Sequence, residues 1–169
     1  MPSSQTLDDL IRNKAASLRE ESAYYAIDWD ERRTWWQGCV DAFLTEIVGW
    51  FQTLVDEGVI TATRKPIEIR EEHIGKYSTE SLTLAIDALT FDVIPVETHA
   101  VGGFGHISLV GSAGHAKLLL CSTDDTLPIL EQRATAEWYF VRSRDDEQVY
   151  QMTEWTFKSL YTELMSIGI

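Results

Sequence analysis

The sequence has little of what marks several special classes of protein. Its two cysteines, Cys39 and Cys121, are far apart and have no CxxC partner, so neither a disulfide framework nor a zinc site is expected. No apolar run approaches the roughly 20 residues that cross a bilayer. The first residues have neither the basic stretch nor the apolar core of a signal peptide. The composition therefore predicts a cytoplasmic protein that needs no cofactor or metal and does not enter a membrane.

Catalytic motifs are also scarce. The stretch 110–114, Val-Gly-Ser-Ala-Gly, comes close to the G-x-S-x-G elbow of serine hydrolases, but the only histidine after Ser112 is His115, three residues later. Residues 102–105, Gly-Gly-Phe-Gly, are too short for a dinucleotide-binding fingerprint, and no helix is predicted after them. Glu71 and Glu72 are adjacent in a predicted strand, where neighbours point to opposite faces. No motif assigns a chemistry.

Basic residues are few: 14 of them stand against 27 acids, which gives a net charge of −13 and a pI near 4.6. The acidic excess is spread along the chain, since residues 1–60 carry −6 and residues 61–169 carry −7. Such a field repels nucleic acid and anionic membranes and favours a basic partner. Solubility alone is the simpler explanation of the same composition.

What the chain does contain is a series of apolar, β-branched segments separated by tight reversals. Glycines at 102–103 and at 111 and 114 suit the turns of two hairpins. Together with two long helical patterns before the segments and one after them, they predict an α+β fold. Four segments form its centre: Leu82–Asp87, Asp92–Thr98, Phe104–Val110 and His115–Cys121.

One register satisfies both hairpins. Turn centres at Val101-Gly102 and at Ser112-Ala113 place Glu97 opposite His106 and Ser108 opposite Lys117. Because side chains alternate along a strand, one face becomes apolar and the other more polar. The apolar face is predicted to hold Ile94, Val96, Ile107, Leu109, Ala116, Leu118 and Leu120.

The flanking elements complete a single domain over residues 1–169. We expect a helical part at 1–58, an antiparallel sheet at 59–152 and a C-terminal helix at 153–169. The apolar spacing predicts helices over Thr6–Ser22 and Trp29–Glu57, and a last helix that Thr153 caps. About six strands should form a twisted antiparallel meander covered by these helices. The outer strands are predicted at 67–74, 136–142 and 148–152, with loops at 75–80 and 123–133. Turns are predicted at 59–66 and 145–147.

Two surfaces could have a function. Glu97, His106, Ser108 and Lys117 share the polar sheet face, where a histidine held by a carboxylate could transfer protons. Such a charge partner is expected to raise the pKa of His106. Ordinary cross-strand pairs explain the same pattern. On the second helix, Thr34–Thr63 contains no basic residue, and Trp35 and Trp50 accompany acids. The predicted docking residues are Trp35, Asp41, Glu46 and Trp50, unless the first helix covers the tryptophans.

The leading interpretation is a non-catalytic, acidic protein-binding module for a basic protein, for example an immunity or inhibitor protein against a basic toxin. A small enzyme or ligand-binding protein with a pocket at Glu97 and His106 is the alternative. A self-associating structural subunit is a third hypothesis, and it would present an apolar sheet edge or helix face to a second copy.

Overall fold

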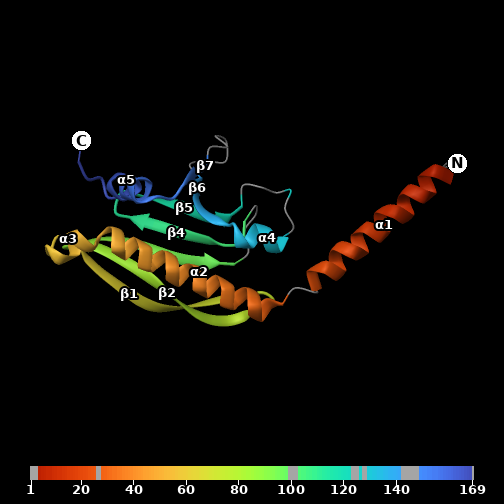
Figure 1. Ribbon diagram of the computed structural model, residues 1–169, viewed down its shortest axis with the longest axis horizontal. Helices are drawn as coiled ribbons and strands as arrows, with labels where there is room; N and C mark the ends of the chain where they lie inside the picture. The colour runs from red at the N-terminus through yellow and green to blue at the C-terminus, as the bar shows by residue number, and fades with distance from the viewer. Residues whose placement is uncertain are drawn as a thin grey trace.

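The structure is a computed structural model that describes residues 4–25, 28–98, 103–122, 126, 129–141 and 149–168. These residues form five helices and one open antiparallel sheet of seven strands in chain order (Figure 1). The strands are β1 (Thr61–Glu71), β2 (Gly75–Ile86), β3 (Leu89–Glu97), β4 (His106–Gly111), β5 (Gly114–Cys121), β6 (Glu137–Val141) and β7 (Val149–Gln151). The helices are α1 (Ser4–Tyr25), α2 (Trp29–Trp50), α3 (Gln52–Asp56), α4 (Ile129–Ala134) and α5 (Glu154–Leu164). The predicted α+β meander is confirmed, with seven strands instead of about six.

The core lies between one face of the sheet and the two helices α2 and α5. Phe157 of α5 meets Phe43 of α2 and Phe91 of β3 edge-on, with ring centroids 6.4 and 5.9 Å apart. Aromatic rings in this arrangement bury large areas and fix the angle between the elements that bear them. Thr153 caps α5 as predicted, because its side chain accepts a hydrogen bond from the Thr156 N–H.

The helix predicted over Trp29–Glu57 is two helices, and this prediction was wrong in its continuity. At Phe51 the backbone leaves helical geometry, and its N–H is shared between the carbonyls of Ile47 and Val48, each 3.2 Å away. The short helix α3 follows. Gly58 then ends the helical part with a φ of 76°, as the sequence indicated, because glycine enters the left-handed region without strain.

The first helix is longer than predicted, and it does not cover Trp35 and Trp50. It runs from Ser4 to Tyr25, and in Figure 1 it projects away from the sheet and from α2. Trp35 instead packs against Phe104, and Trp50 packs against Phe43 and Phe157. The hypothesis that the first helix covers the two tryptophans is therefore wrong.

The hairpin between β4 and β5 has the predicted register throughout, with Ser108 opposite Lys117 and Ile107 opposite Leu118. In the hairpin between β3 and β4, Glu97 lies opposite His106 as predicted, but an irregularity between Pro95 and Glu97 shifts the rest. The inserted residue is Val96, and a bulge of this kind reverses the alternation of the residues before it.

The bulge overturns two predicted core positions. Ile94 is only half-buried and Val96 is exposed, whereas Phe91, Val93 and Pro95 point into the core in their place. Downstream of the bulge the predicted face is confirmed, since four of its residues are buried: Ile107, Leu109, Leu118 and Leu120.

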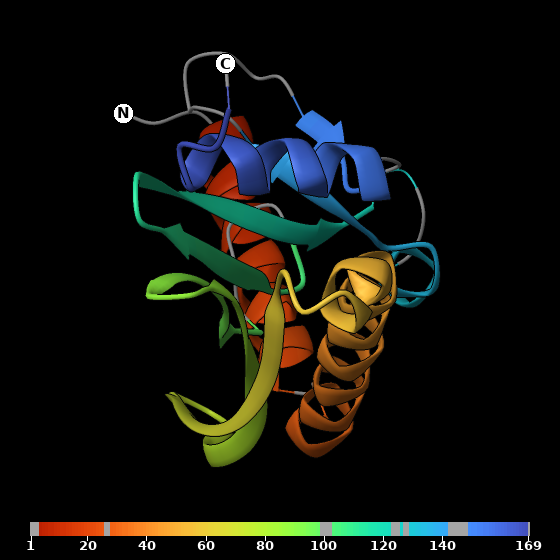
Figure 2. The same cartoon turned by 90° about the vertical axis from the view of Figure 1, so that its left-hand side faces the viewer.

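The first two strands form a ribbon that starts earlier and is longer than predicted. Residues 61–66 and 75–80, expected as a turn and a loop, belong to β1 and β2, and only residues 72–74 form the turn between them. Burial alternates along both strands but changes phase at the same level, between Arg64 and Ile67 and between Thr79 and Leu82. The pairing is continuous there, so the ribbon coils and keeps one side toward α2 (Figure 2).

The remaining elements agree in part with the predictions. The loop expected over residues 123–133 contains the short helix α4, and the two last predicted strands correspond to β6 and β7. The turns predicted at residues 100–103 and 145–147 lie wholly or mostly outside the described residues. Pro66 lies in β1, which is an edge strand, as its missing N–H favours.

Gly105 lies against the largest buried side chain of α2. A Cβ atom at this position would lie 2.2 Å from the ring of Trp36, which is itself fully buried. Replacing Gly105 with alanine should therefore lower the free energy of unfolding by about 1–3 kcal/mol through overpacking. Urea unfolding measures this change.

Gly49 in α2 provides the matched control, because nothing lies within 4 Å of the place where its Cβ atom would be. Gly49→Ala should raise the free energy of unfolding by about 0.5–1 kcal/mol, since alanine favours a helix more than glycine does. Equal effects of the two substitutions would contradict the close contact between Gly105 and Trp36.

Candidate functional site

A pocket of about 240 Å³ lies where the turn after β1 meets the start of α2 and the end of β3. Three carboxyl groups, two aromatic rings, one guanidinium and one aliphatic side chain line it. Its residues are Trp29, Arg70, Glu71, Glu72, His73, Ile74 and Glu97. It is smaller than the roughly 300–1,000 Å³ of pockets for drug-sized ligands, so its size fits a single side chain.

Local sequence explains why these elements meet here. Asp28 caps α2 by accepting a hydrogen bond from the Glu31 N–H at 3.0 Å, which starts the helix at Trp29. Gly75 adopts a φ of 80° and lets the chain reverse directly into β2. The turn thereby brings His73 against Trp29, and their rings stack with centroids 5.0 Å apart.

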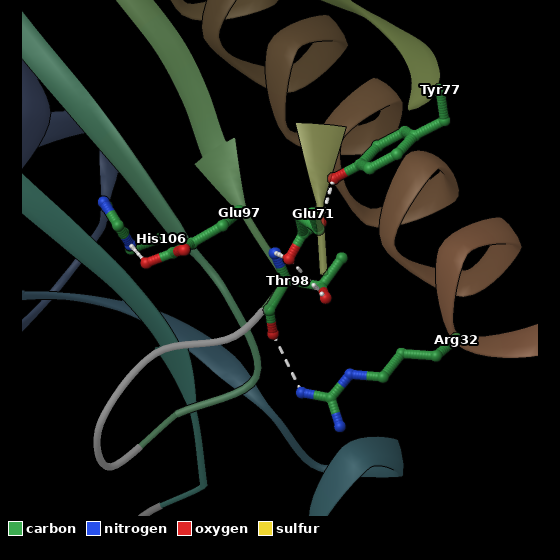
Figure 3. A network of polar contacts seen from close by, with 6 residues as sticks. All are labelled: Arg32, Glu71, Tyr77, Glu97, Thr98 and His106. Atoms are coloured by element: carbon green, nitrogen blue, oxygen red, sulfur yellow. Dashed lines mark hydrogen bonds and ion pairs between the residues drawn. The ribbon is translucent and has the colours of Figure 1, made fainter. Parts of the chain in front are cut away.

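Glu71 forms the inner wall of the pocket and joins three segments of the chain (Figure 3). Its Oε1 accepts hydrogen bonds from the backbone N–H and the hydroxyl of Thr98, at 2.9 and 3.1 Å. Its Oε2 accepts a hydrogen bond of 2.5 Å from the Tyr77 hydroxyl. Arg32 of α2 extends the network by donating to the Thr98 carbonyl at 2.8 Å.

Burial shifts the pKa of two members of this network, Tyr77 and Arg32. Burial raises the pKa of Tyr77, and its hydrogen bond to Glu71 raises it further, so the hydroxyl stays protonated and donates. Burial and the neighbouring Arg133 lower the pKa of Arg32, while Glu71 and Glu31 oppose that shift. Arg32 still carries its charge at neutral pH, because an arginine pKa starts far above 7.

Glu71 and Glu72 line the same pocket although they are sequence neighbours. The opposite-face expectation fails because β1 ends at Glu71 and Glu72 already belongs to the turn. The two groups also differ in their partners. Glu71 is half-buried and accepts three hydrogen bonds, whereas Glu72 is exposed and has no hydrogen bond or ion pair with the residues that the structure describes.

The structure brings Glu97 and His106 together, with Oε1 and Nδ1 3.5 Å apart. Burial lowers the pKa of His106 and Lys117 lowers it further, while Glu97 and Glu71 oppose the change. The expectation that a charge partner would raise this pKa was wrong, since His106 is only 9% exposed and burial has the larger effect. His106 is therefore neutral at pH 7.

The four candidate catalytic residues do not line one common pocket. Glu97 lines the pocket described above, whereas Ser108 and Lys117 line another pocket, of about 530 Å³, beside α5. His106 lines neither of the two. Lys117 is exposed and Ser108 is half-buried. The sequence placed these residues on one face but could not show that they line different pockets or, for His106, neither of them.

The predicted docking residues lie on two sides of α2. At about 100° per residue, Trp35, Glu46 and Trp50 fall on one flank and Asp41 on the other. Trp35 is half-buried beneath Arg133, whose guanidinium carbon lies 4.5 Å from the ring centroid. Trp50 is half-buried among core rings. Asp41 and Glu46 are exposed, and Asp41 pairs with Arg64 at 2.6 Å.

Several residues of the pocket were missed by the sequence analysis. Trp29 could have been found through the cap at Asp28, which puts an aromatic side chain at the first helical position. Thr98 and Tyr77 gave no signal, because their roles depend on contacts across 27 and 6 residues of chain with Glu71. Among the described residues, no group of histidine, cysteine, aspartate and glutamate has the arrangement of a metal site.

Comparison of the chain with protein-family models, with curated proteins and with solved structures gives no match. None of the helices that the structure describes is both long and apolar enough to cross a membrane. The case for a function therefore depends on the geometry of the pocket and on the charge of the chain.

The Glu71 network should contribute measurably to stability. Glu71→Gln places an amide N–H₂ against the donors of Thr98 or Tyr77, so one buried polar group loses its partner. We expect the free energy of unfolding to fall by about 1–3 kcal/mol in urea. Glu68→Gln in the same strand is the control, because Glu68 is exposed and forms a surface ion pair with Lys76. A loss no larger than the control's would contradict the network.

The His106 pKa can be followed by NMR titration. Lys117→Gln should raise it and Glu97→Gln should lower it, because the first removes a repelling charge and the second an attracting one.

The folded-state pKa of His106 lies below the ordinary 6.5, so the unfolded chain takes up the proton first as the pH falls. His106 therefore adds stability above about pH 6.5 that is lost as the pH falls through the folded-state pKa. His106→Gln should remove this part of the acid dependence, and an unchanged pH profile would contradict the assignment.

Proposed function

We propose that the protein is a non-catalytic binding module for a basic partner protein, and that its pocket receives a lysine or arginine side chain of that partner. The observation that supports this best is the lining of the pocket, where Glu71, Glu72 and Glu97 face a space of about 240 Å³ beside Trp29. Carboxylates and an aromatic wall together favour an organic cation.

The charges around the pocket favour a cation over an anion. Against three carboxyl groups, Arg70 is the one arginine or lysine in the lining, so these four groups together carry a formal charge of −2. An ammonium or guanidinium group that enters would find Glu72 without a partner among the described residues. Glu71 already accepts three hydrogen bonds, so its role is to shape the pocket more than to bind the cation.

The whole chain would assist such an encounter. A net charge of −13 attracts a basic protein over a long range and raises the association rate, most strongly at low salt. An immunity or inhibitor protein that neutralises a basic toxin is one concrete form of this function. It rests on charge and pocket chemistry, and it would place the partner's cationic side chain as an anchor in the pocket.

A small enzyme that uses Glu97 and His106 is the second candidate. The observation in its favour is a neutral histidine 3.5 Å from a carboxylate, a pair that can accept and hold a proton. It ranks lower because His106 is nearly inaccessible and does not line the pocket that Glu97 lines. A substrate would reach Glu97 but not the histidine.

Binding of short synthetic peptides tests the pocket. Peptides of equal length that are rich in lysine, arginine or glutamate are titrated into the protein and followed by calorimetry. The basic peptides should bind and the acidic one should not. The double variant Glu72→Gln/Glu97→Gln should weaken the binding of the basic peptides by about 5- to 30-fold, as expected for two partly exposed ion pairs.

The matched control removes two charges from α2 with the double variant Asp41→Asn/Glu46→Gln. A loss of affinity confined to the pocket variant supports the proposal. A larger loss in the α2 variant would instead assign docking to the surface predicted around Trp35 and Trp50. Equal losses of affinity in the two variants would show that the overall negative charge, and not the pocket, attracts the peptides, and would contradict a role for the pocket. If no basic peptide bound, the proposed function would be contradicted.

A further inference from the structure

Helix α1 presents a row of large apolar side chains to solvent. Leu7, Leu10, Ile11 and Leu18 are 51, 60, 68 and 52% exposed. Their spacing puts them on one side of the helix, and Lys14 lies within the same row. Figure 1 shows α1 extending away from the sheet, so its apolar side faces no other element of the described chain.

Such a helix is not expected to persist alone. Most helical stability in proteins comes from packing an apolar face, and isolated helices gain little from propensity alone. Four exposed aliphatic residues in one row are also more than the scattered apolar residues of an ordinary surface. The row therefore calls for a partner that covers it.

We propose that the partner is a second copy of this chain, and that two α1 helices pair antiparallel about a two-fold axis. A two-fold contact uses the same surface on both copies, so one amphipathic helix supplies both halves. This inference concerns α1 alone and does not depend on the proposed pocket function.

The distribution of charge favours the antiparallel arrangement. Helix α1 has four acids and three bases, which leaves the rest of the chain with 23 acids and 11 bases, a net charge of −12. Two such bodies repel each other. Parallel helices would bring them to the same end of the pair, whereas antiparallel helices hold them at opposite ends of a rod about 33 Å long, at 1.5 Å per residue.

The side chains also suit an antiparallel register. With the two-fold axis between Arg12 and Asn13, Leu7 lies opposite Leu18 of the second copy and Ile11 lies opposite Lys14 of the second copy. The long Lys14 side chain then reaches Asp8 of the second copy, one turn beyond Ile11. Both Lys14 and Asp8 are exposed and available for this pair. A parallel register would instead place Lys14 opposite Lys14 of the second copy, so two positive charges would face each other.

Sedimentation equilibrium of the full chain over a range of concentrations tests the pairing. Ile11→Glu should weaken dimerisation at least about a hundredfold, because each dimer buries this residue twice. Ala16→Glu introduces the same residue on the opposite side of α1 and should leave the dimer unchanged. A wild-type monomer at all concentrations, or a dimer that Ile11→Glu does not affect, would overturn the proposal.

Charge exchange and cross-linking test the direction. Lys14→Glu should weaken the dimer, and adding Asp8→Lys should restore it, because the pair then has its charges exchanged. In a mixture of Leu7→Cys and Leu18→Cys chains, oxidation should link position 7 of one chain to position 18 of the other, with the wild type reporting any background from Cys39 and Cys121. Predominant linkage between two copies of position 7 would show a parallel pair and overturn the antiparallel one. A monomer in which α1 folds back onto its own body would also contradict it.

Discussion

The carboxyl group of Glu71 is the constraint on which the pocket depends. A half-buried carboxylate is tolerated only when its oxygens are satisfied, and here a backbone N–H and two hydroxyls donate to it. The donors come from β2 and from the segment after β3, and Arg32 connects that segment to α2. Four stretches of chain therefore hold their positions around one side chain. Of the two acids beside it in the pocket, Glu97 lies near His106, whereas Glu72 has no hydrogen bond or ion pair among the described residues.

The sequence was sufficient for much of the fold because alternation and turns are local signals. The β4–β5 hairpin was predicted residue by residue, since a two-residue turn at Ser112-Ala113 leaves only one register that hides Ile107 and Leu118. The preceding hairpin was predicted correctly only at Glu97 and His106. The one local sign of the bulge at Val96 is Pro95, because a proline has no N–H for the ladder and within an interior strand such as β3 it is found at bulges. The apolar residues on both sides fit either phase, so the alternation itself does not reveal the bulge.

The candidate site was less predictable for a physical reason. The adjacency of Glu97 and His106 follows from register, but the pKa of His106 depends on how deeply tertiary packing buries it, and no pattern of neighbours contains that information. The pocket itself joins Trp29, the turn at His73 and the end of β3, which meet only after α2 has packed on the sheet. Likewise, the helical period identified α1 as amphipathic, but the assumption that its apolar side covers the sheet was mistaken.

The coiled β1 strand has a consequence for how the sheet ends. An open sheet leaves unpaired backbone groups along its outer strands, and a long, flat outer strand invites further strands to add to it. The last strand, β7, spans only three residues, but β1 spans 11. Lys65 and Pro66 lie at the level where β1 changes its phase of burial, so a charge, a missing N–H and a coil coincide there. The addition of further strands, as in a cross-β stack, is therefore disfavoured at this edge. Many aliphatic residues can then occupy the strands without copies of the chain associating through β1.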